Sequence, residues 1–416
     1  MQVNRQRLEK DFNNIAQFGS LEKGGVTRLA FTPEDMKVRE YLKEVMEELG
    51  LTISIDAFGN MRGRRDGREN LPPVIIGSHL DTVPEGGHFD GVVGVIGALE
   101  VIRVLNENNI ITKRPVEVIN FSCEESSRFG GATLGSKAMA GKIGIDDLKK
   151  YKDKAGISLY EELESKGFRP NDIASAQIGT GDIYAFVELH IEQGPVLEAN
   201  NIPIGIVTSI AAPTRFKVII EGRADHSGNT PMGLRKDALA AASELVLGVE
   251  KIAREEAGEN TVGTVGYLYV QPGAMNVVPG KVELGIDIRD INSEDKLKAV
   301  DAVKRLMGEI AATRGVKVDY EILTHDEPVS LAEKVINTIE VTAQEKDIPY
   351  IKMPSGAGHD AMHMADIAQA GMIFIPSING ISHNIAENSK MEDIVQGTEL
   401  LLAVTIKLAQ EGEMIK

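Results

Sequence analysis

The order of apolar segments in the middle of the sequence restricts the fold more than any other feature. Between residues 212 and 326, periodicities of two and of about 3.6 residues predict six elements in the order β-α-β-β-α-β. This is the order of a ferredoxin-like unit, in which four strands form an open sheet and two helices cover one face. We therefore predict an inserted ferredoxin-like domain at 212–326. Its expected elements are strand 215–221, helix 234–256, strand 261–270, strand 281–289, helix 294–313 and strand 316–323.

The segments on either side of this insertion have a different order of predicted strands and helices. Strands that alternate with helices indicate a sheet with crossover helices. The length of 416 residues also exceeds what one hydrophobic core usually supports. We therefore predict a second, α/β domain formed jointly by residues 1–211 and 327–416. Its expected elements include strands 74–76, 116–121 and 372–375 and helices 92–106, 331–346 and 394–410.

Charge and cysteine content narrow the functions that the chain can have. The 45 Lys and Arg stand against 62 Asp and Glu, so the formal net charge is −17 and nucleic acid is not an expected partner. Cys123 has no second cysteine to pair with, and the N-terminus lacks the apolar core of a secretion signal, so we expect a cytoplasmic protein. No apolar stretch approaches the roughly 20 residues that span a bilayer, and no membrane role is expected.

A histidine and two aspartates follow the predicted strand 74–76. In the segment GSHLDTVP, His79 is able to bind a metal while the carboxylate of Asp81 accepts the other ring N–H. Asp90, a short loop later, is within reach of the same ion. Taken alone, the His-x-Asp pattern fits a hydrogen-bonded turn equally well.

Two adjacent carboxylates, Glu124 and Glu125, follow the strand 116–121. Neighbouring side chains at a strand end point in opposite directions, so one is able to bind metal while the other faces a water as a general base. An exposed acidic turn is the alternative. His190 follows an apolar run and His383 comes after the strand 372–375, although a single histidine in a strand is more often structural.

Together these side chains predict a hydrolytic site that holds two divalent ions. His79, Asp90, Glu125, His190 and His383 supply imidazoles and carboxylates, with Asp90 as the bridge. Such a pair of ions acidifies a water and polarises a carbonyl, while Glu124 takes the proton. We expect no zincin-like site at His359 and His363, because Asp360 stands where that motif needs a glutamate.

Eight segments of the sequence resemble the hydantoinase/carbamoylase family of di-zinc amidohydrolases, nearly from end to end. The segments are GSHLDTVPEGGHFDG, CEESSRFGG, ELHIEQGP, DHSGNTPM, NVVPG, DIRD, GAGHDA and SHN. The resemblance implies an aminopeptidase-like di-metal catalytic domain with an inserted lid and dimerisation domain. It implies that His79, Asp90 and His190 hold one ion and that Asp90, Glu125 and His383 hold the other, with Glu124 as the base.

The same resemblance implies roles for residues outside the metal ligands. Asn276 and Arg289 would bind the substrate carboxylate, together with Gln193 and the backbone around Gly358. The chain would be a homodimer in which His226 reaches the metals of the neighbouring subunit. From the residues alone, the turn at 225–231 reads as a helix cap formed by Asn229 or Thr230, and Arg289 as a salt-bridge partner of Asp290.

A histidine at position 190, where related peptidases usually carry a carboxylate, points to the carbamoylase branch. The expected reaction is hydrolysis of an N-carbamoyl-L-amino acid to the amino acid, ammonia and carbon dioxide. Allantoate hydrolysis is the nearest alternative, followed by 3-ureidopropionate hydrolysis, cleavage of aminoacyl peptides and a catalytically silent binding protein. Imidazole and carboxylate ligands accept Zn, Mn, Co or Ni, so the sequence leaves the metal open.

Overall fold

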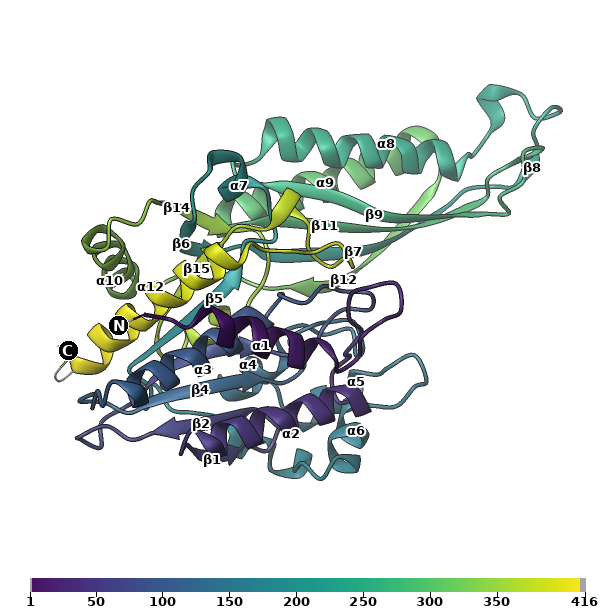
Figure 1. The fold of residues 1–416 in the computed structure, drawn as a ribbon. Helices are drawn as coiled ribbons and strands as arrows, with labels where there is room; N and C mark the ends of the chain where they lie inside the picture. The colour runs from purple at the N-terminus through teal and green to yellow at the C-terminus, as the bar shows by residue number, and fades with distance from the viewer. Residues whose placement is uncertain (1, 412–416) are drawn as a thin grey trace. The chain divides into compact units, whose positions relative to one another are not determined.

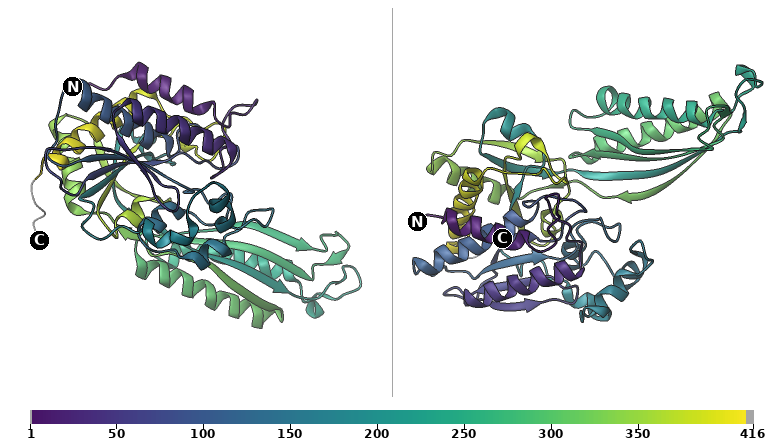
Figure 2. Two further views of the ribbon diagram at one scale, coloured as in Figure 1. Left: turned by 90° about the horizontal axis from the view of Figure 1, so that it is seen from below. Right: turned by 45° about the vertical axis from the view of Figure 1, so that its right-hand side comes forward.

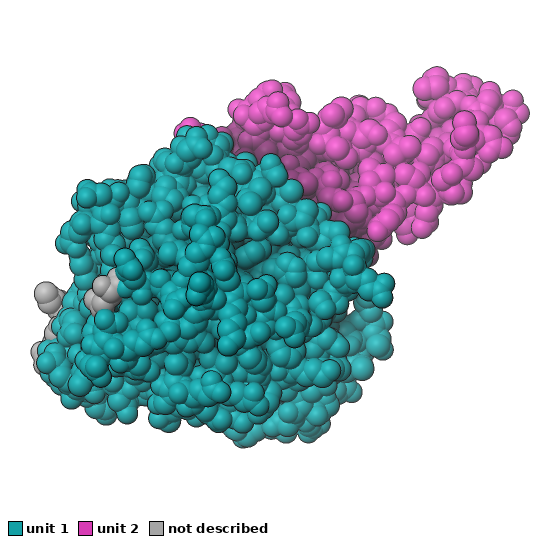
Figure 3. Space-filling view, in the orientation of Figure 1, with its two compact units in different colours: residues 1–208, 330–416 teal, residues 209–329 magenta. Residues whose placement is uncertain are grey.

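The computed structural model describes residues 2–411 and contains two compact units. The first unit consists of Met1–Thr208 and Ser330–Lys416, and the inserted unit of Ser209–Val329 (Figure 3). The chain thus leaves the first unit once and returns to it. No helix within residues 2–411 is long and apolar enough to cross a membrane.

The first unit is built on a mixed sheet with the strand order β1-β2-β4-β3-β5-β15-β6-β13, and β14 pairs with β6. Strands β4, β3, β5 and β15 run parallel to one another, which confirms the predicted α/β class. The edge strand β1 and its neighbour β2 were not predicted, because their sequences TISI and MRGRR contain no apolar run. The strands are β1 Thr52–Ile55, β2 Met61–Arg65, β3 Val74–His79, β4 Val116–Phe121, β5 Ala185–Ile191, β6 Ile204–Ile210, β13 Val329–Ser330, β14 Tyr350–Ser355 and β15 Gln369–Ile375.

Helices cover this sheet, and the central strands are apolar and buried along their whole length. The helices α3 and α12 pack against β3 and β5, and both contact α1 (Figure 1). The helices of the first unit are α1 Arg5–Ala16, α2 Pro33–Glu48, α3 Val92–Glu107, α4 Leu134–Met139, α5 Ile145–Lys150, α6 Leu159–Ser165, α7 Val196–Asn200, α10 Glu333–Glu345, α11 Ala361–Met364 and α12 Met391–Gln410.

The inserted unit has the predicted β-α-β-β-α-β order, and its sheet runs β12-β7-β11-β9 with antiparallel neighbours. Figure 2 shows both helices on one face of this sheet. Alternate residues of β7 and β11 are buried against them, so the other face carries the polar side chains. The elements are β7 Ala212–Glu221, α8 Ala238–Lys251, β9 Val262–Gln271, β11 Lys281–Asp290, α9 Ser293–Arg314 and β12 Lys317–His325.

Two details of the inserted unit differ from the prediction. Helix α8 begins at Ala238 rather than at 234, because the side chain of Asp237 caps it by accepting the backbone N–H of Leu239 and Ala240. The segment 225–231, which was expected to be a turn, begins with the short strand β8 Asp225–His226, and this strand pairs with β10 Val277–Val278 in a two-stranded ribbon. The helix cap is therefore neither Asn229 nor Thr230.

Candidate metal centre

The five predicted metal ligands lie together in the first unit. They form two groups that share Asp90, and the ligand atoms of each group lie within 4.8 Å of one another. Asp90 Oδ1 is 3.7 Å from Nε2 of His79 and 3.2 Å from Nε2 of His190. Asp90 Oδ2 is 3.2 Å from Nε2 of His383, which is 3.3 Å from Oε1 of Glu125. One oxygen of Asp90 thus faces each group, which is the arrangement of a carboxylate that bridges two ions.

The two strand histidines are oriented by main-chain carbonyls. His79 ends β3 and its Nδ1 lies 2.9 Å from the carbonyl oxygen of Asp81, while Nδ1 of His190, in β5, lies 2.9 Å from that of Ile191. A carbonyl accepts and does not donate, so the Nδ1 atom of each ring carries a proton. The Nε2 atom of each ring then points at Asp90, as in a metal-binding histidine that is held by a second contact.

The role predicted for the Asp81 carboxylate is wrong. Its Oδ1 is 3.8 Å from Nδ1 of His79, and the main-chain carbonyl of Asp81 makes the shorter contact instead. The carboxylate accepts the backbone N–H groups of Glu124 and Glu125, at 3.2 and 3.0 Å. The chain turns after His79 in such a way that the carbonyl points back at the ring. Asp81 therefore orients His79 through its backbone and the glutamate pair through its side chain.

Glu124 and Glu125 are buried, which excludes the alternative of an exposed acidic turn. The residue before them, Cys123, has a φ of 57°, a left-handed conformation that reverses the chain after β4. Oε2 of Glu124 lies 3.8 Å from Nε2 of His79, while Glu125 faces His383. Burial, and then the charge of Glu125, raise the pKa of Glu124 well above its usual range. Such a carboxyl group is suited to accept and return a proton.

The charge balance of the cluster fits divalent cations. Within residues 2–411, no Lys or Arg forms a salt bridge with Asp90, Glu124 or Glu125. Hydrogen bonds to Asp90 and Glu125 raise the pKa of His383 to about 11, and the bond to Asp90 raises that of His190 to about 9 although burial opposes it. The donor set of imidazoles and carboxylates suits Zn, Mn, Co and Ni.

Two further side chains beside this cluster were missed by the sequence analysis. The ring centroid of His359 lies 4.5 Å from that of His190, and Glu188 forms a third group of potential ligands with these two histidines. His363 lies elsewhere, with Nε2 2.9 Å from Oγ1 of Thr133, so the two histidines do not form a zincin-like pair. The spacing of Glu188 and His190 along one strand, which places both on the same face, was the available signal.

Gln193 and Gly358 also belong to the first unit. Nε2 of Gln193 donates to Oδ2 of Asp90 at 2.7 Å, and its backbone N–H donates to Oγ of Ser377. The buried Oε1 of Gln193 has no hydrogen-bond partner in the described part of the chain. Gly358 precedes the buried His359 in the loop between β14 and α11.

The other predicted substrate contacts lie in the inserted unit. His226 is exposed in β8, and its Nδ1 accepts the backbone N–H groups of Gly228 and Asn229 at 3.1 and 3.2 Å. An Nδ1 that accepts leaves the proton on Nε2, so the ring presents an N–H donor. Asn276 directly precedes β10, the other strand of this ribbon, and its main-chain carbonyl accepts the backbone N–H of Ser227.

Arg289 lies on the polar face of the sheet in the inserted unit. Its guanidinium donates to both oxygens of Asp287, at 2.9 and 3.1 Å, and Nε of Arg215 reaches the same carboxylate at 2.9 Å. Arg289 thus forms a salt bridge, but with Asp287 and not with the adjacent Asp290, because neighbouring residues of a strand point to opposite faces. The carboxylate of Asp290 accepts the backbone N–H of Asn292. Two guanidinium groups thus share the carboxylate of Asp287.

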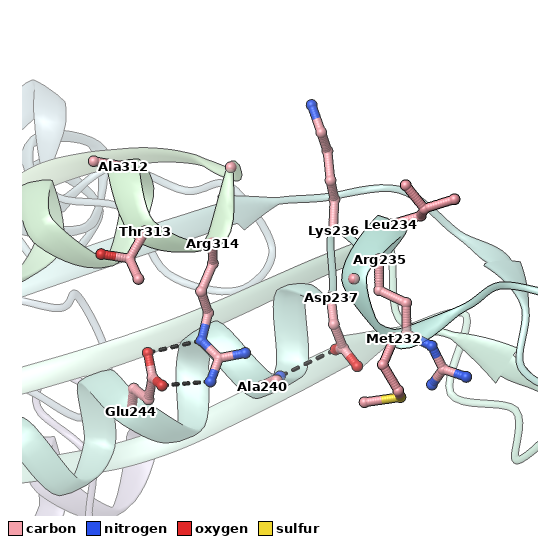
Figure 4. A pocket seen from close by; sticks show the side chains of 12 residues that line it. Met232, Leu234, Arg235, Lys236, Asp237, Ala240, Glu244, Ala312, Thr313 and Arg314 are labelled. Atoms are coloured by element: carbon pink, nitrogen blue, oxygen red, sulfur yellow. Dashed lines mark hydrogen bonds and ion pairs between the residues drawn. The ribbon is translucent and has the colours of Figure 1, made fainter.

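A cavity of about 670 Å³ in the inserted unit contains none of the predicted site residues. It lies between the start of α8 and the end of α9, where Arg314 pairs with Glu244 (Figure 4). The exposed side chains of Met232 and Leu234 also line it. The candidate catalytic chemistry therefore lies in the ligand cluster and not in this cavity.

The sequence of residues 75–407 matches Peptidase family M20/M25/M40. The chain therefore belongs to this family of hydrolases. The candidate ligand groups described above agree with the metal dependence of the family.

Individual relatives place the chain among the amidohydrolases of this family. The N-carbamoyl-L-amino-acid amidohydrolase of Pseudomonas sp. is 40% identical over 97% of this chain and 98% of the relative. The ureidoglycolate hydrolase of Oryza sativa is also 40% identical, over 98% of this chain and 85% of the relative. A hydantoinase/carbamoylase family amidase from Burkholderia multivorans superposes with a TM-score of 0.90 at 36% identity and 99% coverage of both chains. These similarities confirm the predicted family and an enzyme that acts on C–N bonds.

Proposed function

We propose that this protein hydrolyses the ureido C–N bond of N-carbamoyl-L-amino acids and releases the amino acid, ammonia and carbon dioxide. The observation that carries the proposal is the pair of ligand groups that share Asp90, one of which contains His190. In the family that the sequence resembles, a histidine at this position indicates the carbamoylase branch. The 40% identity to a named N-carbamoyl-L-amino-acid amidohydrolase, over nearly the whole chain, supports the substrate class.

The proposed site holds two divalent ions. His79, Asp90 and His190 would bind one, and Asp90, Glu125 and His383 the other. When bound, the ions polarise the ureido carbonyl and lower the pKa of a water near it. The candidates are Zn, Mn, Co and Ni.

Glu124 moves the proton in the proposed reaction. It accepts a proton from the attacking water and returns it to the departing ammonia nitrogen, so the C–N bond breaks and a carbamate of the amino acid remains. The carbamate then loses carbon dioxide to give the free amine. Asp81 holds the backbone of Glu124, and the buried Oε1 of Gln193 is placed to accept an N–H of the ureido group.

We also propose that Arg289 and Asn276 bind the substrate carboxylate. The planar fork of Arg289 matches a carboxylate, and the second guanidinium beside it, from Arg215, balances the charge of Asp287.

Arg289→Lys is expected to lower kcat/KM for a carbamoyl amino acid by about 10- to 100-fold, because a lysine cannot form two parallel hydrogen bonds with a carboxylate. The matched substrate is the same compound with its carboxylate amidated. We expect wild type to have a low kcat/KM for the amidated compound, and Arg289→Lys to lower this value only slightly further. Equal losses for both compounds would show that Arg289 does not bind the carboxylate.

Ureidoglycolate and allantoate are the second candidates, because they also join a ureido group to a carboxylate. The similarity to a ureidoglycolate hydrolase is as high as that to the carbamoylase, at 40% over 98% of the chain. Both candidate reactions would use the same ligand groups and the same Arg289.

The proposal is tested by an activity panel in which each substrate is assayed with added Mn, Co or Zn. The substrates are N-carbamoyl-L-methionine, N-carbamoyl-β-alanine, allantoate, ureidoglycolate and a dipeptide. We expect the highest kcat/KM with the carbamoyl amino acid. Turnover of the dipeptide alone would overturn the assignment based on His190, and turnover of none, together with no bound metal, would indicate a silent binding protein. A cytoplasmic location and a homodimer remain predictions.

A further inference from the structure

Three of the five proposed ligands, Asp90, Glu125 and His383, come from loops rather than from strands. Asp90 precedes α3, and His383 lies in the irregular segment between β15 and α12. His383 has a φ of 53°, in the left-handed region, and half of its side chain is exposed. A ligand in such a segment keeps its position only if other contacts hold the loop.

The buried carboxylate of Glu387 contacts both loops. Its Oε1 accepts the backbone N–H groups of Phe89 and Asp90, each at 3.1 Å. Its Oε2 accepts the hydroxyl of Ser382 at 2.9 Å and the backbone N–H of His383 at 3.3 Å. Each carboxylate oxygen thus accepts hydrogen bonds from one of the two loops, and Glu387 is only 3% exposed.

We infer that Glu387 is a positioning residue that joins the Asp90 and His383 loops and so builds the group for the second ion. This inference rests on the two-ion site of the proposed function. The Ser382 hydroxyl also lies 3.0 Å from Oδ2 of Asp90 and so has a second acceptor. Loss of the Glu387 carboxylate would leave three backbone N–H groups without their acceptor, those of Phe89, Asp90 and His383, and the loops would separate or turn. The distance of 3.2 Å between His383 and Asp90 would then no longer be held.

The first ion should depend much less on Glu387. Its two histidines, His79 and His190, belong to β3 and β5 and are oriented by carbonyls of their own strand ends, both at 2.9 Å. Asp90 also has a contact that is independent of Glu387, because Gln193 donates to its Oδ2. A positioning role therefore predicts an unequal effect on the two ions.

Glu387→Gln is the most informative variant because it preserves size. One side-chain oxygen remains, and its favoured orientation keeps the two N–H groups of Phe89 and Asp90 satisfied. The new NH₂ group then faces the N–H of His383, and two donors repel. The amide therefore removes the support of the His383 loop and leaves that of the Asp90 loop.

The experiment is a titration of the metal-free protein with Zn²⁺ or Mn²⁺, followed by calorimetry and by metal analysis. We expect wild type to bind two ions, and Glu387→Gln to bind the first normally and the second about 10- to 100-fold more weakly. Glu387→Ala should lower the affinity for the second ion at least as much. The control Asp56→Ala removes a half-buried carboxylate that also accepts three backbone N–H groups but contacts no proposed ligand. It should bind both ions as wild type does.

The outcomes separate this inference from the proposed function. If wild type binds two ions and Glu387→Gln binds both with unchanged affinity, Glu387 has no positioning role. Equal weakening of both ions, or the same weakening in Asp56→Ala, also overturns it, because a general loss of stability would then be the cause. If wild type itself does not bind two ions, the result contradicts the proposed two-ion site and not the role of Glu387 alone.

Discussion

Glu124→Gln is expected to lower kcat by about 10²- to 10⁴-fold while both metal ions stay bound, because an amide has the shape of the acid but cannot accept the proton of the attacking water. The side chain is buried, and its Oε2 lies 3.8 Å from Nε2 of His79. It is not in either ligand group. The measurement combines steady-state kinetics with metal analysis of the purified variant.

Glu125→Gln is the matched control, since it makes the same chemical change at the next residue. Its carboxylate belongs to the group with Asp90 and His383, and a neutral amide is a poorer ligand. We therefore expect this variant to lose one ion. If Glu124→Gln lost an ion and Glu125→Gln kept both, the two roles would be exchanged.

The second large effect is expected at His226, which we propose acts across a dimer interface. Its ring presents an Nε2–H donor, as needed to stabilise the oxygen on which negative charge develops in the transition state. The inserted unit offers an interface, because its open sheet leaves β12 and β9 as edge strands. His226→Ala should lower kcat by about 10²- to 10³-fold with unchanged metal content.

Complementation distinguishes action across the interface from action within one chain. Inactive His226→Ala and Glu124→Gln subunits are mixed under conditions that allow exchange. Half of the dimers are then mixed, and each has one intact site, so about a quarter of the wild-type activity should return. A mixture that stays inactive although mixed dimers are present would place His226 in its own active site or outside catalysis.

The sequence was sufficient to predict which residues would meet, because the ligands follow strands whose carboxyl ends share one edge of a parallel sheet. It was not sufficient for contacts made by the main chain. The carbonyl of Asp81, rather than its carboxylate, orients His79, and this depends on the turn that follows β3. The same is true of Glu387, whose partners Phe89 and Asp90 lie far away in the sequence. The periodicity of apolar residues predicts helices and strands, whereas these contacts depend on the conformation of the loops between them.

The wide spacing of the proposed ligands along the chain has a consequence for how the protein acquires its metal during synthesis. His79, Asp90 and His190 precede the inserted unit in the chain, whereas His383 follows it. The proposed group for the second ion therefore cannot assemble during synthesis until the inserted unit and β15 have been made, although the ligands of the first ion are present before then. The second ion would then be selected by a site that forms only when both parts of the first unit are present, and not by short ligand segments that compete for metal while the chain is still growing.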